Sequence, residues 1–319
     1  MAVYTDVSDS DLQHFMAEYE LGEVLACKGI AEGVENSNFL LTTGAGNFIL
    51  TLYEKRVNPE DLPFFIGLME HLAAHGFACP VPVAGRDGHS LRRLCGRPAA
   101  VISFLEGLWP REILPFHCAG VGDTLARLHL AGAGFDMTRP NDLSLAGWRR
   151  LVEATGARAH EVAPGLAQEL AQELAALEAL WPASLPRGTV HADLFPDNVF
   201  FRGREVTGVI DFYFACTDFY AYDLAVCLNA WCFGLDHVFE PERAQLLIDA
   251  YQARRPLSEA EIAALPVLAR GSALRFLLTR LYDWLNRPPG ALVRQKDPLE
   301  YLKKLRFHRA AGGPEAYGL

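Results

Sequence analysis

The stretch GTVHADLFPDNVFFRGREVTGVIDFYFA, residues 188–215, decides the fold class of this chain. Two apolar runs, VFF and VTGVI, flank the turn-prone RGR and predict a β-hairpin. Leucines at helical spacing on either side of the stretch predict helices. We therefore expect an α+β protein in which this hairpin interrupts a mainly helical lobe.

Chemically active side chains gather at the open end of the predicted hairpin. His191, Asp193 and Asn198 fall on the loop before the first arm, and Asp211 ends the second arm. A hairpin brings its two ends together, so Asn198 and Asp211 can approach one point in space. Amide and carboxylate oxygens are ligands suited to Mg²⁺, which fills the rest of its shell with water and nucleotide phosphates. Asp193 is then available as a base.

The chain before the hairpin region reads as a small sheet with two helices. Leu12, Phe15, Met16 and Tyr19 lie at helical spacing behind Ser8, a favoured N-cap. Short β-rich runs separated by glycine predict an antiparallel meander. The expected elements are strands at 24–28, 38–42, 47–53, 81–84, 91–94 and 99–104, and a helix from Asp61 to Gly76 with Asp61 as its cap.

From residue 107 the pattern is mainly helical. Residues 117–131 and 165–181 carry apolar side chains at helical spacing. We place the boundary between a small N-terminal lobe, 1–106, and a larger C-terminal lobe, 107–319, at Glu106-Gly107.

Composition narrows the functional class. The 319 residues carry a formal net charge of −10, which argues against nucleic acid and against an anionic membrane surface as partners. The first fifteen residues lack a basic region followed by an apolar one, so we expect a soluble cytoplasmic protein. The seven cysteines form no C-x-x-C pair and predict neither zinc nor redox chemistry.

The pattern H-x-D-x-x-x-x-N followed by I-D-F resembles the aminoglycoside-phosphotransferase and choline-kinase superfamily, relatives of the protein kinases. The resemblance implies a two-lobe, protein-kinase-like fold that uses ATP and Mg²⁺. It also implies the site residues: Asp193 orients or deprotonates the acceptor hydroxyl, His191 positions the catalytic loop, and Asn198 and Asp211 bind magnesium. Asp223 resembles the aspartate that supports this loop from beneath.

The same resemblance implies a nucleotide site in the small lobe. GIAEGVENSNF, residues 29–39, sits where the phosphate-covering turn of the superfamily lies, and AAVISFLEG, residues 99–107, resembles the strand that leads into the adenine-binding hinge. The ATP contacts implied are Gly33, Asn36, Ser37, Asn38, Lys55, Glu70, Ser103 and Leu105.

One position departs from the superfamily pattern. A lysine is expected in the third strand, paired with a helix glutamate, but Thr51 occupies that position. Glu70 can serve as the glutamate, and Lys55 or Arg56 could reach the phosphates from the end of the strand. A pseudokinase that binds nucleotide without turnover is therefore an alternative, although retention of the base and both metal ligands argues against it.

The wording over nearly the whole chain resembles the bacterial homoserine kinases related to aminoglycoside kinases, notably in GIAEGVENSNF and in SALRFLLTRLYDWL, residues 272–285. Homoserine is a zwitterion, so its site needs a cation for the carboxylate and an anion or carbonyl groups for the ammonium. The expected small-molecule contacts are Asp193, Tyr213, Arg275, Arg280 and Asp283.

Kinases for other small alcohols or amines, such as choline, ethanolamine, a methylthio-sugar or an aminoglycoside, remain alternatives. A choline site would want an aromatic cage, for which Tyr213, Tyr220, Tyr222 and Trp231 are available.

Overall fold

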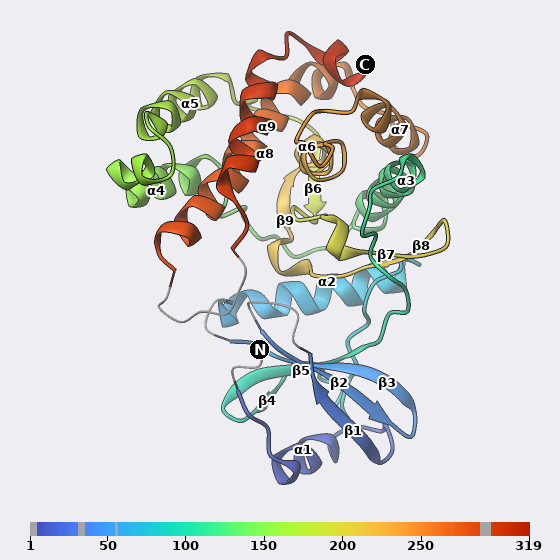
Figure 1. Ribbon diagram of the computed structural model, residues 1–319. Coiled ribbons are helices and arrows are strands. Elements are labelled where there is room, and N and C mark those ends of the chain that lie inside the picture. The colour runs from blue at the N-terminus through green and yellow to red at the C-terminus, as the bar shows by residue number, and fades with distance from the viewer. Residues whose placement is uncertain (1–4, 31–35, 55–56, 288–294) are drawn as a thin grey trace.

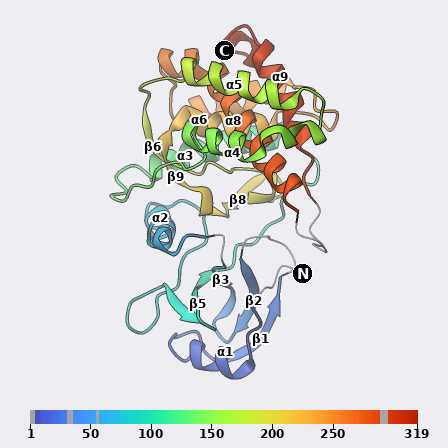
Figure 2. The same cartoon turned by 90° about the vertical axis from the view of Figure 1, so that its left-hand side faces the viewer.

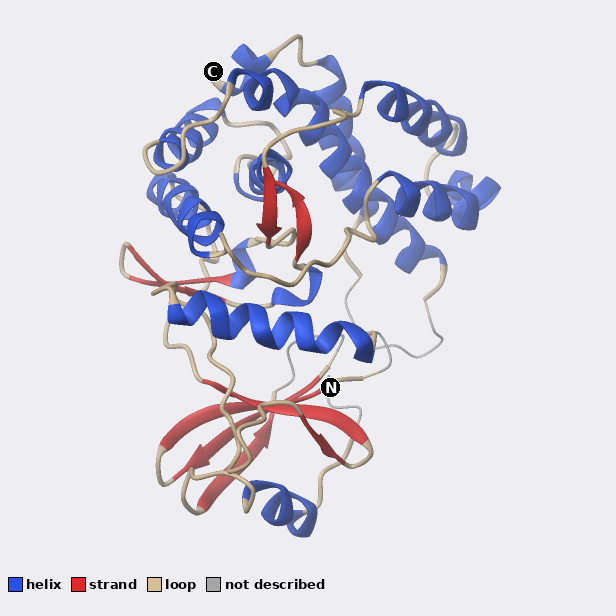
Figure 3. Ribbon diagram, turned by 180° about the vertical axis from the view of Figure 1, so that it is seen from behind, coloured by secondary structure: helices blue, strands red, loops and turns tan. Residues whose placement is uncertain are grey.

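The computed structural model describes residues 5–30, 36–54, 57–287 and 295–319. A five-stranded sheet and a mainly helical part lie on either side of one central helix, α2 (Leu62–Ala74; Figure 1). Turned views show the same three layers, with the sheet and α1 (Asp9–Met16) at one end and the remaining helices at the opposite end (Figures 2 and 3). This is the two-lobe arrangement that the sequence predicts.

The sheet has the order β1-β2-β3-β5-β4, and its neighbouring strands are antiparallel. One face packs against α1 through a cluster of buried leucines and aromatic residues. Ser8 caps α1 by accepting the N–H of Asp11, as its sequence predicts. The elements are α1 (Asp9–Met16), β1 (Val24–Gly29), β2 (Ser37–Thr43), β3 (Gly46–Leu52), α2 (Leu62–Ala74), β4 (Arg92–Leu94) and β5 (Arg97–Ser103).

One expectation for this lobe is wrong and another holds in part. Residues 81–84 do not form a strand: they run beside β5 with a single bridge from Pro82 to Ile102, and the ladder ends at Val81 because its N–H donates to the side chain of Ser103 at 2.8 Å and not to the backbone carbonyl. Asp61 is the N-cap residue of α2 and a proline follows in the first turn, as predicted, but the side chain of Asp61 makes no capping bond. Its carboxylate instead accepts a hydrogen bond from Arg139 at 2.8 Å.

The helical part carries the hairpin on the side that faces α2 (Figure 1). β7 and β8 pair antiparallel across the turn at Gly203, as predicted, and β6 pairs with β9. The elements are α3 (Pro115–Ala131), α4 (Leu145–Thr155), α5 (Leu166–Leu180), β6 (Arg187–Val190), β7 (Val199–Arg202), β8 (Glu205–Val209), β9 (Cys216–Phe219), α6 (Tyr220–Trp231), α7 (Pro241–Gln252), α8 (Glu259–Leu285) and α9 (Pro298–Ala310).

Helix α8 is long and apolar enough to cross a membrane, because a stretch of 18 residues in it has a mean hydropathy of 1.4. Within the protein 61% of that stretch is buried, and α8 packs against α4, α6 and α9. These contacts identify α8 as a core helix of the helical part.

One large core joins the two sides of the molecule. Buried side chains of α2, including Phe65 and Leu72, belong to the same apolar cluster as those of α6 and α8. Helix α2 therefore packs against the helical part through this shared core.

Candidate active site

The loop between β6 and β7 is held by a buried carboxylate. Asp223, in the first turn of α6, accepts the N–H of His191 at 2.7 Å and the N–H of Ala192 at 2.8 Å. Ala192 has φ 61°, a left-handed conformation that is costly for a residue with a Cβ. The two hydrogen bonds stabilise this conformation and so fix the backbone that precedes Asp193. Asp223 supports the loop as the sequence predicts.

The ring of His191 joins this loop to the end of the hairpin. Its Nδ1 accepts the N–H of Asp193 at 3.2 Å, and Nε2 lies 3.0 Å from the carbonyl oxygen of Ile210. Burial lowers the pKa of His191, so the ring is neutral, with its proton on Nε2. His191 therefore positions Asp193 relative to the residue that precedes Asp211.

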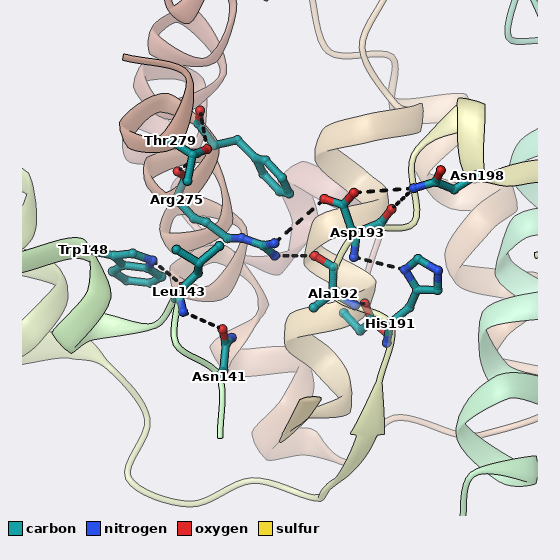
Figure 4. Close-up of polar contacts among 11 residues, drawn as sticks. Asn141, Leu143, Trp148, His191, Ala192, Asp193, Asn198, Arg275 and Thr279 are labelled. Atoms are coloured by element: carbon teal, nitrogen blue, oxygen red, sulfur yellow. Dashed lines mark hydrogen bonds and ion pairs between the residues drawn. The ribbon is translucent and has the colours of Figure 1, made fainter. Parts of the chain in front are cut away.

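Asn198 and Asp211 lie together at the open end of the hairpin. The N–H of Ile210 donates to the carbonyl oxygen of Asn198 at 3.0 Å, which brings the two chain segments side by side. The side-chain amide of Asn198 donates to the backbone carbonyl of Asp193 at 2.8 Å, and this leaves its Oδ1 for another partner (Figure 4). Asp211 has φ 67°, a second left-handed residue in the site.

A buried arginine faces Asp193. Arg275 of α8 donates from Nη1 to the carbonyl oxygen of Ala192, and its Nη2 lies 3.8 Å from Asp193 Oδ1 (Figure 4). Its guanidinium also lies 5.4 Å from the ring centre of Phe214 and 4.5 Å from that of Phe276. Of the acceptor contacts expected on α8, Arg275 is the one that the structure brings to Asp193.

Burial dominates the electrostatics of Asp193. Its side chain is 18% exposed, and loss of hydration raises its pKa to about 6, although Arg275 lowers it in part. A carboxyl with this pKa is ionised at neutral pH, yet it binds a proton more strongly than an exposed aspartate does. This suits a group that must accept a proton from an alcohol.

The buried His129, on α3, was not singled out by its sequence pattern. Its Nε2 lies 3.1 Å from Asp223 Oδ2, and its Nδ1 lies 2.7 Å from the hydroxyl of Tyr251. It thus contacts the same carboxylate oxygen that accepts the N–H of His191. A lone histidine in an apolar helix gives no spacing signal, so only the fold reveals this role.

Two residues of the predicted phosphate turn, Asn36 and Ser37, form hydrogen bonds with the buried Glu54. Gly33 and Lys55 lie outside the described residues. Glu54 accepts the hydroxyl of Ser37 at 2.7 Å, and its N–H donates to Asn36 Oδ1 at 3.3 Å. The sequence YEKR does not predict these contacts of Glu54, because the two cations that follow it are the expected phosphate contacts.

Thr51, at the position of the expected lysine, is buried and hydrogen-bonded. Its hydroxyl donates to Asn38 Oδ1 at 2.8 Å across β2 and β3. The structure does not bring Glu70 to this strand: the residue is exposed and accepts the hydroxyl of Ser90 at 2.8 Å. The lysine–glutamate pair of the superfamily is therefore replaced by a neutral hydrogen bond.

The segment after β5 packs on the hairpin. Leu108 and Phe201 exchange two backbone hydrogen bonds. Gly107, at φ 145°, allows close approach, because a Cβ there would meet Thr207 Oγ1 at 2.4 Å. The N–H of Ser103 donates to the carbonyl oxygen of Val81 at 2.9 Å, and its hydroxyl accepts the N–H of Val81 at 2.8 Å. The hinge contacts expected at Ser103 and Leu105 stay predictions.

The clamp expected from Arg280 and Asp283 is not formed. Arg280 donates to Glu300 of α9 at 2.6 Å and to the carbonyl oxygen of Asp297, whereas Asp283 is exposed. Spacing along α8 could not reveal that α9 supplies a carboxylate opposite Arg280. Tyr213 packs edge-on against Tyr53, with ring centres 5.7 Å apart, and burial raises its pKa well above the usual range.

Comparison with known proteins gives the family. The phosphotransferase enzyme family matches residues 26–257. The homoserine kinase of Paramagnetospirillum magneticum is 61% identical over 100% of both chains. That of Rhodospirillum rubrum is 64% identical over 100% of this chain and 99% of its own.

Solved structures share the fold at low sequence identity. An amicoumacin kinase in complex with AMP-PNP superposes with a TM-score of 0.69 at 14% identity, covering 96% of this chain and 95% of that one. A choline kinase from Cryptosporidium parvum gives a TM-score of 0.63 at 14% identity, covering 89% of this chain and 88% of that one. The family match spans well over half of the sequence, and the chain belongs to the phosphotransferase enzyme family.

Proposed function

We propose that this chain is a homoserine kinase, which transfers the γ-phosphoryl group of ATP to the side-chain hydroxyl of L-homoserine. The observation that carries this proposal is 61–64% identity, over essentially whole chains, to two proteins of that activity. The products are O-phospho-L-homoserine, a precursor in threonine biosynthesis, and ADP.

In this reaction the homoserine oxygen forms a bond to the γ-phosphorus while the bond from that phosphorus to the β–γ bridging oxygen breaks. We assign the acceptance of the hydroxyl proton to the carboxylate of Asp193. Support comes from its partial exposure, its raised pKa and its fixed loop. His191 and Asp223 position this carboxylate and take no part in proton transfer.

We assign magnesium binding to Asn198 and Asp211. The donor atoms fit magnesium. The hydrogen bond from Asn198 to Asp193 uses Nδ2 and not the oxygen Oδ1, and Asp211 supplies a carboxylate on the adjacent chain segment. The described residues hold no group of three or more His, Cys, Asp or Glu side chains suited to a metal. A two-ligand site agrees with an ion that takes its other ligands from water and phosphates, where it neutralises phosphate charge.

A choline site is not favoured by the described aromatic residues. Trp231 and Tyr222 are fully buried, and the indole N–H of Trp231 donates to the carbonyl oxygen of Leu194 at 2.8 Å. The ring of Tyr213 packs against Tyr53 and Phe65. Trp231 and Tyr222 therefore pack in the core, whereas Tyr213 is only partly buried and lines the pocket beside Arg275.

We further propose the lobe boundary at Glu106-Gly107, which gives 1–106 for nucleotide and 107–319 for catalysis and acceptor. Strand β5 ends at Ser103, and Leu108 already pairs with the hairpin. A cytoplasmic location remains a prediction from the sequence.

The test is a coupled ADP-release assay with homoserine, serine, threonine, choline, ethanolamine and an aminoglycoside. Serine is one methylene shorter, and an oxygen misplaced by about 1 Å can cost roughly a hundredfold in rate. We expect homoserine to give the highest kcat/KM. Preference for choline or an aminoglycoside would refute the acceptor assignment but keep the kinase chemistry.

A further inference from the structure

A pocket of about 310 Å³ lies beside Arg275, between the start of α2, the loop before α4 and the segment that follows Asp211. Its walls include Asp61, Arg139, Phe214 and Arg275. Binding pockets for small molecules are commonly about 300–1,000 Å³, so this one suits a ligand of amino-acid size and is small for an aminoglycoside.

The pocket lies within reach of the proposed base. Arg275 lines it and also contacts the catalytic loop, with Nη2 3.8 Å from Asp193 Oδ1. Figure 4 shows its guanidinium directed toward Ala192 and Asp193, with Leu143 of the pocket wall beside its side chain. A ligand that contacts the guanidinium of Arg275 therefore lies close to Asp193.

The charged side chains of the pocket wall fall into two groups. Arg139 lies between two carboxylates, 2.8 Å from Asp61 and 2.9 Å from Asp142, so that one cation faces two anions. Arg275 has one carboxylate partner, Asp193, at the longer distance of 3.8 Å. The excess carboxylate beside Arg139 favours a cationic group of the ligand, and the guanidinium of Arg275 favours an anionic one.

We propose that this pocket binds the amino-acid end of the acceptor, with the α-ammonium toward Asp61 and Asp142 and the α-carboxylate toward Arg275. The side-chain hydroxyl then points back along Arg275 to Asp193. This inference rests on the proposed function, which it deepens by naming the groups that select an α-amino acid. Asp61 lies just before α2 and Asp142 in the loop before α4, whereas Arg275 is a contact that the sequence predicted on α8.

A ligand comparison tests the ammonium contact. 4-Hydroxybutanoate has the carboxylate and hydroxyl of homoserine but lacks the ammonium. The measured quantity is the ratio of kcat/KM for homoserine to kcat/KM for 4-hydroxybutanoate. Asp61→Asn should lower this ratio about tenfold, as expected when a charged hydrogen-bond partner is lost. Asp142→Asn should lower it less, because the side chain of Asp142 is 63% exposed and that of Asp61 is 25% exposed.

Asp136→Asn is the matched control, since Asp136 is an exposed aspartate of the same connection and does not line the pocket. It should leave the ratio unchanged. If Asp61→Asn fails to fold, Leu143→Phe, which narrows the pocket, decides by raising the KM for homoserine while the KM for ATP stays within about twofold.

The outcomes separate this inference from the proposed function. No turnover of homoserine by the wild type would refute the proposed function. Turnover by the wild type with an unchanged ratio in Asp61→Asn, or an unchanged homoserine KM in Leu143→Phe, would overturn the pocket assignment alone.

Discussion

Replacing Asp193 with asparagine should abolish most activity and, at alkaline pH, stabilise the protein. Burial raises the pKa of Asp193 from 3.8 to about 6. A carboxyl whose pKa is raised in the folded state contributes stability below its unfolded pKa, and that contribution is lost as pH rises through the folded pKa. Wild type should thus lose stability between pH 4 and pH 8 through this group, and Asp193→Asn should not.

The magnitude follows from the shift of about two pKa units at about 1.4 kcal/mol each, which gives at most about 3 kcal/mol. Urea unfolding of both proteins at pH 4 and pH 8, without nucleotide or magnesium, measures the change in their stability difference. Asp197→Asn controls for the loss of one charge from the same loop. In Asp193→Asn, kcat should fall by roughly two to four orders of magnitude relative to wild type.

Two results would refute this reasoning. A stability difference that does not change with pH would mean that the carboxyl of Asp193 is not destabilised by burial. Retained turnover in Asp193→Asn would remove this residue from the role of base. In wild type, kcat/KM should rise with pH through about 6 as the carboxyl loses its proton.

Two further predictions concern the nucleotide side. Asp211→Ala should abolish magnesium-dependent turnover and Asn198→Ala should raise the magnesium requirement, because each removes an oxygen ligand; magnesium titrations of initial rate that match wild type would contradict both assignments. Because Thr51 replaces the expected lysine, Lys55→Ala or Arg56→Ala should raise the KM for ATP, and an unchanged KM and kcat in both variants would place the phosphate contact elsewhere.

Local sequence was sufficient for the elements and for the hairpin. Ser8 and the apolar spacing behind it mark α1, and the runs on either side of Gly203 mark β7 and β8. These features depend on neighbours within a few residues, so periodicity and turn chemistry reveal them. The strand expected at 81–84 is reduced to one bridge because the N–H of Val81 bonds to the side chain of Ser103, a contact with a distant residue that local composition does not predict.

Contacts between distant segments could not be read from the chain. Arg280 was expected to face the acceptor, yet Glu300 of α9 takes its charge. Arg139 and Asp61 meet across 78 positions of sequence, and no local pattern announces that pair. When several charged partners are possible for one side chain, the packing of the helices determines which of them it contacts. The proposed acceptor pocket could therefore be found only in the folded structure.

The central claim is tested most directly by the product formed from ATP, magnesium and L-homoserine. Phosphorus NMR of the reaction mixture distinguishes a phosphate ester on the side-chain oxygen from free inorganic phosphate. We predict that O-phospho-L-homoserine accumulates in step with ADP. Release of inorganic phosphate alone, or ADP formation that does not depend on homoserine, would contradict the account.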